Sequence, residues 1–270
     1  MTTSIRDISA TLEVEVTAAT VLDMQVAVAR VPGLGFEEEL RVAVDGLWVT
    51  PSEVVGECES RIHRLTLDPG MLTISYSATV SAPADPIPVA ATDPTVYLRP
   101  SRYAECDKFY GFASRQFDTS RTQAELLTDV TDYVKSRLSY IPGSSDPIDG
   151  AADTLLAGAG VCRDYAHLVV ALLRALNVPA RVVAVYAPGC SPMDFHAVAE
   201  ALVDGEWVVV DATGLAPRQS LVRIATGRDA ADTAFLDNHG GSITLKSYQV
   251  FATVRGDLPD DDGTARIRIS

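Results

Sequence analysis

The sequence contains neither a paired cysteine motif nor a long apolar run. Its four cysteines, Cys58, Cys106, Cys162 and Cys190, include no C-x-x-C pair, which argues against a zinc ribbon or a dithiol redox motif. No apolar stretch approaches the roughly 20 residues of a membrane-spanning helix. The N-terminus also lacks the basic and then apolar segments of a secretory signal. We therefore expect a cytoplasmic protein with free thiols and no membrane partner.

Positive charge is also scarce. Lys and Arg together number 22 against 36 Asp and Glu, which gives a net charge of −14. Nucleic-acid affinity depends on basic surface, so the composition argues against a nucleic-acid partner. The four histidines show none of the i, i+3 or i, i+4 spacings that place two ligands on one helix face. We expect no metal and no other cofactor.

What the sequence does have, over its first third, is the pattern of β-strands. Runs such as Leu12–Val16 and Leu72–Tyr76 alternate apolar and polar residues, and turn signals such as Asp45-Gly46 separate such runs. A Pro-rich, nearly uncharged stretch over residues 82–94 then reads as a linker or an extended crossover. These features predict an antiparallel β-sandwich domain over residues 1–100.

After residue 100 the apolar residues follow a helical period. A capping box at Thr122 and Glu125 predicts a helix that ends near Leu138. A second helix is expected from near Cys162 to Leu176, and it is apolar almost all round, which indicates burial. Strand patterns then return as far as Val254. We predict an α+β catalytic domain over residues 101–270, with helices packed on an antiparallel sheet.

The cysteine at the start of the second helix has the features of a nucleophile. At a helix N-terminus, unpaired N–H groups and the helix dipole favour the thiolate and are expected to lower the pKa of Cys162. The backbone at Val161 and the hydroxyl of Tyr140 are candidates for stabilising an oxyanion or lining the cleft. Gly158 and Gly160 are expected to let the substrate backbone come close.

A hairpin count places an imidazole and a carboxylate side by side. Asp204-Gly205 between two apolar runs predicts a two-residue loop, and continuing that register pairs Val198 with Asp211. His196 lies two residues from Val198, on the same face, so it is the diagonal neighbour of Asp211. A thiol, an imidazole and a carboxylate are the parts of an activated sulfur nucleophile, with Cys162 reaching the other imidazole nitrogen.

The segments that carry these residues resemble the bacterial transglutaminase-like superfamily. The similar segments are residues 160–167, 177–181, 196–197 and 211–213, with further likeness over 98–103, 139–143 and 226–232. The resemblance covers most of the chain and is weaker over residues 1–90. It implies a papain-like α+β catalytic domain and thiol acyl-transfer chemistry. It does not imply protein crosslinking, since members include proteases, amidases and inactive binding versions.

The resulting hypothesis is an enzyme that acts on an amide of a peptide or protein substrate. It would be a peptidase, an amidase or a transglutaminase-type acyltransferase, with a thioester on Cys162, His196 as general base and acid, and Asp211 orienting the imidazole. The alternative is a transglutaminase-like scaffold that binds peptides without turnover. We expect water or a small amine, not a bulky protein lysine, as the final acyl acceptor. No motif indicates the substrate or the oligomeric state.

Structural roles are expected for the other polar residues near these motifs. Asp164 is predicted to fix the local backbone or to bind Arg181, and His167 to cap a buried polar group. Cys190 lies in a turn-rich loop that is expected to border the cleft. Ion pairs or loop hydrogen bonds are expected for three residues: Arg228, Asp229 and Asp232.

Overall fold

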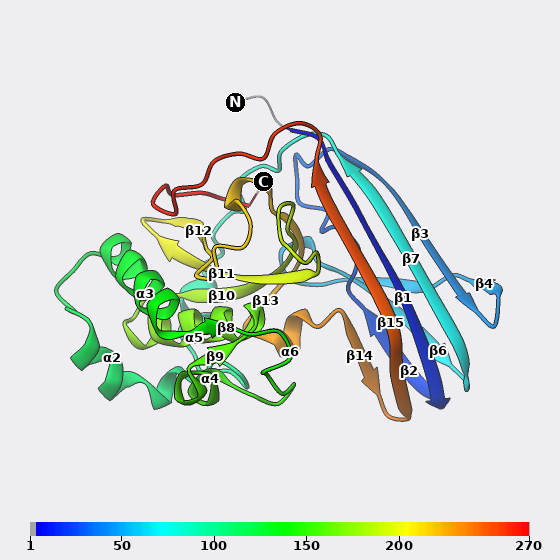
Figure 1. Cartoon of the computed structure of the whole chain (residues 1–270), viewed down its shortest axis with the longest axis horizontal. Coiled ribbons are helices and arrows are strands. Elements are labelled where there is room, and N and C mark those ends of the chain that lie inside the picture. Colours follow the sequence, from blue (N-terminus) through cyan, green and yellow to red (C-terminus); the bar gives the residue numbers. More distant parts are fainter. Residues whose placement is uncertain (1–3, 270) are drawn as a thin grey trace.

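Strands with alternating burial form two antiparallel sheets that stack as a sandwich, on the right in Figure 1. In the computed structural model, which describes residues 4–269, the sheets have the strand orders β15-β1-β7-β3-β4 and β14-β2-β6-β5. Inward side chains such as Leu12 and Val14 are fully buried between the sheets. The strands are β1 (Arg6–Ala18), β2 (Thr20–Met24), β3 (Phe36–Val44), β4 (Leu47–Val49), β5 (Ser52–Val55), β6 (Arg61–Leu67), β7 (Gly70–Val80), β14 (Leu236–His239) and β15 (Ser242–Val254).

Two of these strands come from the C-terminal part of the chain. β15 pairs with β1 from Arg6↔Val254 to Ala18↔Ser242, and β14 pairs with β2. The sequence predicted that all of residues 101–270 form the catalytic domain. That prediction is wrong for β14 and β15, which belong to the sandwich. The pattern of a strand shows which face it buries but not which strand it pairs with, and here the chain returns to cover the edges of the sandwich.

The other lobe contains a four-stranded antiparallel sheet with the order β12-β11-β10-β13, and helix α5 packs on it. This arrangement confirms the predicted α+β class. The elements are α1 (Asp93–Val96), α2 (Tyr110–Gln116), α3 (Gln123–Arg137), β8 (Ser139–Tyr140), α4 (Ala151–Ala157), β9 (Ala159–Gly160), α5 (Cys162–Ala175), β10 (Ala180–Tyr186), β11 (Phe195–Val203), β12 (Glu206–Val210), β13 (Val222–Gly227) and α6 (Ala230–Thr233). Short 3-10 turns are η1 (Glu57–Glu59), η2 (Cys106–Lys108) and η3 (Arg218–Ser220).

The helices of this lobe begin where the sequence indicates. The Thr122 hydroxyl accepts the Glu125 N–H, and the Glu125 carboxylate accepts the Thr122 N–H at 2.8 Å, which confirms the capping box of α3. α5 is buried on nearly every side, with Leu168 and Leu172 fully inaccessible to solvent. Within residues 4–269, no helix has both the length and the apolar character that crossing a bilayer requires.

The β11–β12 hairpin has the predicted register. Asp204 and Gly205 form the loop with φ values of 53° and 81°, as a type I′ turn requires. Leu202 lies opposite Trp207, and Ala199 lies opposite Val210. The same count places Asp211 immediately beyond the end of β12, beside the start of β11.

A buried charge network lies at the junction of the two lobes. The Arg181 and Arg223 side chains both bind the Glu200 carboxylate, and all three are almost completely buried. Burial alone would raise the pKa of Glu200, but the two guanidinium groups lower it to about 2. Arg181 also stacks on Trp207 at 3.8 Å and donates to the sulfur of Cys58 in the sandwich. Asp164 does not bind Arg181, contrary to one of the two predicted roles.

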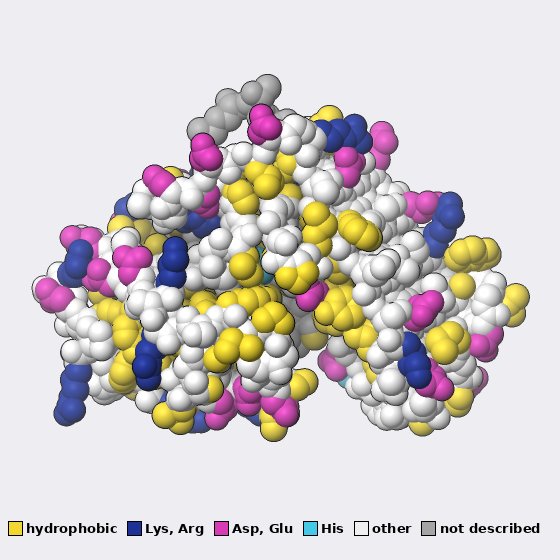
Figure 2. Space-filling model, viewed as in Figure 1, with side chains coloured by type: hydrophobic (Ala, Val, Ile, Leu, Met, Phe, Trp, Pro, Cys, Tyr) yellow, Lys and Arg dark blue, Asp and Glu magenta, His cyan; other side chains and the backbone are white. Residues whose placement is uncertain are grey.

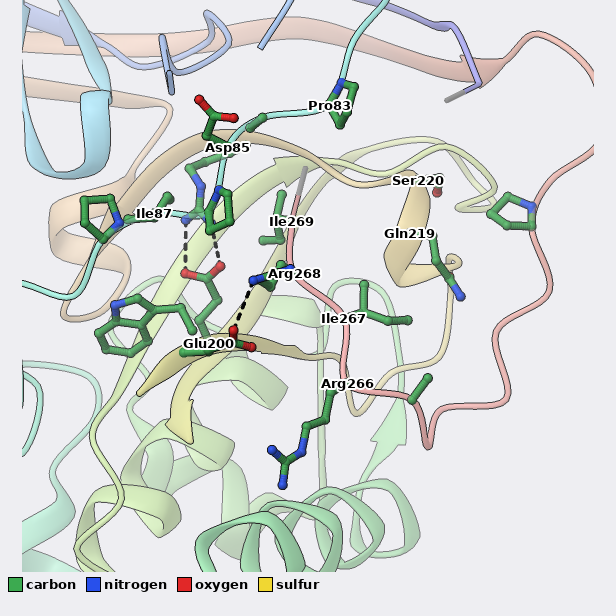
Figure 3. Close-up of a pocket in the computed structure, with 18 of the residues that line it drawn as sticks. Pro83, Asp85, Ile87, Glu200, Gln219, Ser220, Arg266, Ile267, Arg268 and Ile269 are labelled. Carbon is green, nitrogen blue, oxygen red and sulfur yellow. Dashed lines mark hydrogen bonds and ion pairs between the residues drawn. The ribbon is translucent and has the colours of Figure 1, made fainter. Parts of the chain in front are cut away.

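A cavity of about 1010 Å³ lies beside this network (Figure 3). Its walls are the Pro-rich stretch near Pro83, the sheet residues Glu200 and Trp207, and the C-terminal tail near Ile267 and Ile269. In the tail, the Ile267 carbonyl accepts the Val209 N–H at 2.8 Å, so the tail runs along the outer edge of β12. Neither Cys162, His196 nor Asp211 lines this cavity.

Candidate active site

The thiol of Cys162 stands at the N-terminus of α5, as predicted. Cys162 is the first residue of the helix, and Val161 before it is in an extended conformation. Cys162 as a whole residue is partly exposed, and its sulfur lies 3.9 Å from the carbonyl oxygen of Phe195 at the start of β11. α5 therefore places the sulfur of Cys162 next to the start of β11, the strand that carries His196.

His196 and Asp211 form a buried hydrogen-bonded pair. His196 Nε2 lies 2.9 Å from Asp211 Oδ2, and both side chains are at most 2% exposed. The other carboxylate oxygen accepts the N–H and the hydroxyl of Thr213, at 2.8 and 2.6 Å. The predicted contact between imidazole and carboxylate is confirmed, and the turn at Thr213 fixes the orientation of the carboxylate.

The electrostatics of this pair favour a charged imidazole. Burial by itself lowers the pKa of His196, but the Asp211 charge and hydrogen bonds to Asp211 and Cys162 raise it well above its usual value. Burial opposes the charge of Asp211 too, yet His196 and Thr213 hold the pKa of that carboxyl below its usual value. Because Nε2 is bound to Asp211, Nδ1 is the nitrogen available to the thiol, so the three groups can form a thiolate–imidazolium–carboxylate series.

Tyr140 and Val161 are the two candidates for stabilising an oxyanion, and Tyr140 lies close to the thiol of Cys162. Tyr140 in β8 is paired with Gly160 in β9, just before Cys162. Burial and then the charge of Cys162 raise the pKa of Tyr140, while the Cys162 backbone opposes this rise. The Tyr140 hydroxyl therefore lies near the start of α5. The N–H of Val161 instead donates to Asp164 Oδ2 at 2.8 Å.

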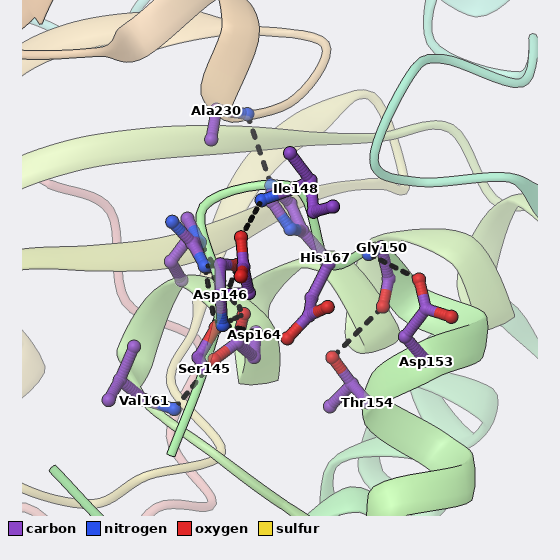
Figure 4. Close-up of polar contacts among 12 residues, drawn as sticks. Ser145, Asp146, Ile148, Gly150, Asp153, Thr154, Val161, Asp164, His167 and Ala230 are labelled. Carbon is purple, nitrogen blue, oxygen red and sulfur yellow. Dashed lines mark hydrogen bonds and ion pairs between the residues drawn. The ribbon is translucent and has the colours of Figure 1, made fainter. Parts of the chain in front are cut away.

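Asp164 holds the loop in front of α5, the other of its two predicted roles (Figure 4). Its second oxygen accepts the Ser145 hydroxyl at 2.9 Å. A Cβ on Gly160 would lie 2.7 Å from the Asp164 Cβ, and Gly158 ends α4 with φ of 67°. Gly160 therefore makes room for Asp164, and Gly158 terminates a helix. Their predicted role in admitting the substrate backbone stays a prediction.

His167 joins α5 to the loop that follows β13 (Figure 4). It is fully buried, and its Nε2 accepts the N–H of Ala230 at 3.1 Å. Burial is the main cause that lowers its pKa to about 3, so the ring is neutral. In the same loop Asp229 caps α6 and accepts the Tyr103 N–H. Arg228 pairs with Asp232 at 2.9 Å, so the predicted structural contacts are confirmed.

Two residues near the thiol, Asp194 and Tyr248, were not predicted from the sequence. Asp194 accepts the Phe195 N–H at 2.7 Å and the hydroxyl of Tyr248 at 3.1 Å. Tyr248 belongs to β15 of the sandwich, so no local pattern near the motifs could reveal it. Cys190 is buried, and its pKa is raised by burial and also affected by the charges of His196 and Cys162. Cys190 therefore lies beside the site, in its wall.

Comparison with known proteins identifies the family of this chain. Residues 111–212 match the transglutaminase-like superfamily. A crystal structure from Cytophaga hutchinsonii, of a protein provisionally named a cysteine protease, superposes with a TM-score of 0.84 and 31% identity, over 95% of this chain and 92% of that one.

Two mycobacterial relatives resemble this chain less than the Cytophaga protein does. One has a lower identity, and the other aligns over a shorter part of the chain. An uncharacterised protein of Mycobacterium leprae is 25% identical over 209 residues, which are 73% of this chain and 68% of the relative. One of Mycobacterium tuberculosis is 31% identical over 158 residues, 53% of this chain, and the match spans about half of the relative, 49%. Taken with the Cytophaga structure, these findings show that the chain belongs to the transglutaminase-like superfamily.

Proposed function

We propose that the protein is a cysteine-dependent enzyme that transfers the acyl group of a peptide or protein amide through a thioester on Cys162. The observation that carries the proposal is the buried His196–Asp211 hydrogen bond beside a partly exposed thiol at a helix N-terminus. A peptide-binding scaffold without turnover has no need of this complete set. The provisional name of the Cytophaga hutchinsonii protein supports the same class of chemistry.

In the proposed reaction the sulfur of Cys162 attacks the amide carbonyl carbon. The negative charge that develops on the carbonyl oxygen is stabilised by the Cys162 N–H and the Tyr140 hydroxyl. The imidazolium of His196 gives its proton to the leaving nitrogen, the C–N bond breaks, and a thioester remains. Neutral His196 then removes a proton from the acceptor, which attacks the thioester and releases Cys162.

Water or a small amine is the proposed acceptor. Hydrolysis requires only that water reach the thioester, whereas transfer to a protein lysine requires a site that binds the lysine chain and excludes water. Cys162 as a whole residue is partly exposed to solvent. The indole of Trp207 covers Arg181 and packs against Tyr97, so this side chain lies in the junction between the two lobes.

An open peptide screen tests the proposal. Peptides that contain glutamine and ordinary backbone amides are incubated with the protein, with and without a primary amine, and read by mass for cleavage, ammonia loss or amine addition. Cys162→Ala is expected to lower kcat at least ~10³-fold. Cys106→Ala, the same substitution at a buried cysteine outside the site, serves as the matched control. Activity of the Cys162→Ala protein within tenfold of wild type refutes the nucleophile assignment.

A further inference from the structure

We infer that a binding site for a positively charged substrate group lies directly beside Cys162, formed by the carboxylate of Asp194 and the rings of Phe195, Phe235 and Tyr248. This inference rests on the proposed function, because it names a chemical feature of the substrate that the thiol attacks. It is carried by the position of the carboxylate, the aromatic residues beside it, and the lack of a cationic partner for it among the residues that the structure describes.

The backbone of Phe195 joins the thiol to the carboxylate. Its carbonyl oxygen lies 3.9 Å from the sulfur of Cys162, and its N–H donates to Asp194 Oδ1 at 2.7 Å. The two groups therefore flank a single residue at the start of β11. The charge of Asp194 also contributes to the raised pKa of Tyr140 and of Tyr248, both of which also respond to Cys162.

Asp194 has no cationic partner among residues 4–269. Over residues 4–269, no Lys, Arg or His forms an ion pair with its carboxylate, which is bound only by the Phe195 N–H and the Tyr248 hydroxyl. The carboxylate is partly exposed. A lone carboxylate beside a sulfur that must carry negative charge opposes that charge. A bound cation offsets the repulsion, so the empty site is complementary to a positive group.

Tyr248, whose hydroxyl binds the Asp194 carboxylate, belongs to a cluster of three aromatic rings. The Phe195 and Phe235 rings stack at 4.8 Å between centroids, and Tyr248 lies 6.4 Å from the first and 6.1 Å from the second. Aromatic faces attract ammonium and guanidinium groups, and their apolar edges accommodate the alkyl stem that carries such a group. A carboxylate with adjacent rings therefore fits a lysine-like or arginine-like group better than an acidic or purely aliphatic one.

The surface around this site is open. Figure 2 shows hydrophobic side chains on both sides of the indentation between the α+β lobe and the sandwich. Met193, Leu245, Tyr248 and Phe251 are among the exposed large hydrophobic residues. Since β15 is an edge strand of the sandwich, the sandwich supplies one wall of the site. The net charge of −14 further favours cationic substrates at long range.

Three thiol reagents of different charge test the inference on the full-length protein. They are methyl methanethiosulfonate, its cationic 2-(trimethylammonium)ethyl analogue and its anionic 2-sulfonatoethyl analogue. Labelling is measured at low salt on the tryptic peptide of residues 138–163, which contains Cys162 alone among the cysteines. After division by the rates for a free small thiol, the cationic reagent is expected to react at least about tenfold faster than the anionic one, which equals about 1.4 kcal/mol.

Asp194→Asn should abolish this charge preference, measured as the ratio of the normalised cationic and anionic rates, because asparagine preserves the shape and an acceptor but not the charge. The neutral reagent should label Cys162 at least as fast as in the wild type, since loss of the carboxylate favours the thiolate. Asp132→Asn, the same change at an exposed position of α3, should preserve the preference. Equal normalised rates in the wild type, or a preference that survives Asp194→Asn, overturn the inference. Slow reaction with the neutral reagent but an intact charge ratio refutes the proposed nucleophile and leaves the cation site standing.

Competition identifies which part of the substrate carries the charge. Protection of Cys162 from the neutral reagent by acetyl-lysinamide but not by n-butylamine assigns the group to a peptide side chain. Equal protection by both assigns it to an amine acceptor. Both results support the site if Asp194→Asn removes the protection, and protection that is unaffected by Asp194→Asn contradicts it.

Discussion

At the scale of single residues, the activity proposed here depends on the protonation state of His196. Burial works against the imidazolium, and the Asp211 carboxylate overcomes it, so the pKa of His196 lies well above its usual value. The carboxylate itself is held by the hydroxyl and N–H of Thr213. A histidine that keeps its proton near neutral pH can both balance a thiolate and protonate a leaving nitrogen.

Asp211→Asn is expected to lower the pKa of His196, because it removes the charge that raises this pKa. Histidine Cε1–H signals titrated by NMR measure this directly, and the chain has only four histidines. Asp132→Asn is the control of equal charge. An unchanged His196 titration in Asp211→Asn contradicts the assigned cause.

The same substitution has a defined effect on stability. A raised histidine pKa adds stability that is complete below the unfolded value of about 6.5 and is lost as pH rises through the folded value. The lowered pKa of Asp211 adds stability above about pH 4 and loses it as pH falls. Urea unfolding should therefore show the largest difference between wild type and Asp211→Asn at about pH 4–6.5, at about 1.4 kcal/mol per unit of pKa shift. A difference that grows toward pH 9 contradicts this sign.

At the scale of elements, the turn of the β11–β12 hairpin sets the register that brings His196 to Asp211. Gly205 has φ of 81°, and no described heavy atom lies within 4 Å of the place where a Cβ would be. Gly205→Ala is therefore expected to lower the free energy of unfolding by about 1 kcal/mol through backbone strain alone. Urea unfolding measures this change.

Gly111→Ala is the matched control for that substitution. Gly111 lies in α2, has no positive φ, and likewise has no described atom within 4 Å of its added Cβ. Alanine in a helix is favoured over glycine by about 0.5–1 kcal/mol, so this variant should be more stable than wild type. Equal effects of the two substitutions contradict the conformational explanation.

The features predicted correctly from sequence are those that neighbouring residues determine. The Asp204-Gly205 turn fixes the hairpin register, and the capping box fixes the start of α3. What could not be predicted depends on contacts between distant segments. Glu200, not Asp164, neutralises Arg181, and Tyr248 reaches the site from a strand more than 80 residues after Cys162 in the sequence. The sequence identifies Gly160 as a position that requires glycine. It does not show that the Asp164 side chain fills the space that a Cβ at position 160 would occupy.

At the scale of the whole molecule, one hydrophobic cluster joins the sandwich to strands β10 and β13 of the α+β lobe, whose helices pack in a separate cluster. Tyr186 in β10 and Ile224 in β13 pack in the same cluster as the inner residues of the sandwich, and the Tyr186 hydroxyl donates to the Val26 carbonyl at 2.7 Å. β14 and β15 return to the sandwich after the β12-β11-β10-β13 sheet is complete. The α+β lobe is thus inserted between two parts of the sandwich.

A fragment of residues 4–100 is expected not to fold alone, because β1 and β2 lose their outer partners. A permuted fragment, in which residues 236–255 are joined by a short linker before residue 4, should fold better. The Arg255 N–H already binds the Ile5 carbonyl at 2.8 Å, so the junction is short. Circular dichroism with thermal unfolding compares the two fragments. A cooperative transition in the unpermuted fragment contradicts this description of the sandwich.

The central claim is that His196 activates the thiol of Cys162. Alkylation by iodoacetamide at pH 6, located by mass on the peptide of residues 138–163, tests it most directly, since an unperturbed thiol reacts only slowly at that pH. The account predicts rapid, stoichiometric labelling of Cys162 in the wild type and labelling at the rate of a free small thiol in His196→Ala. Labelling of wild-type Cys162 no faster than a free small thiol, or equally fast in the two proteins, would contradict it.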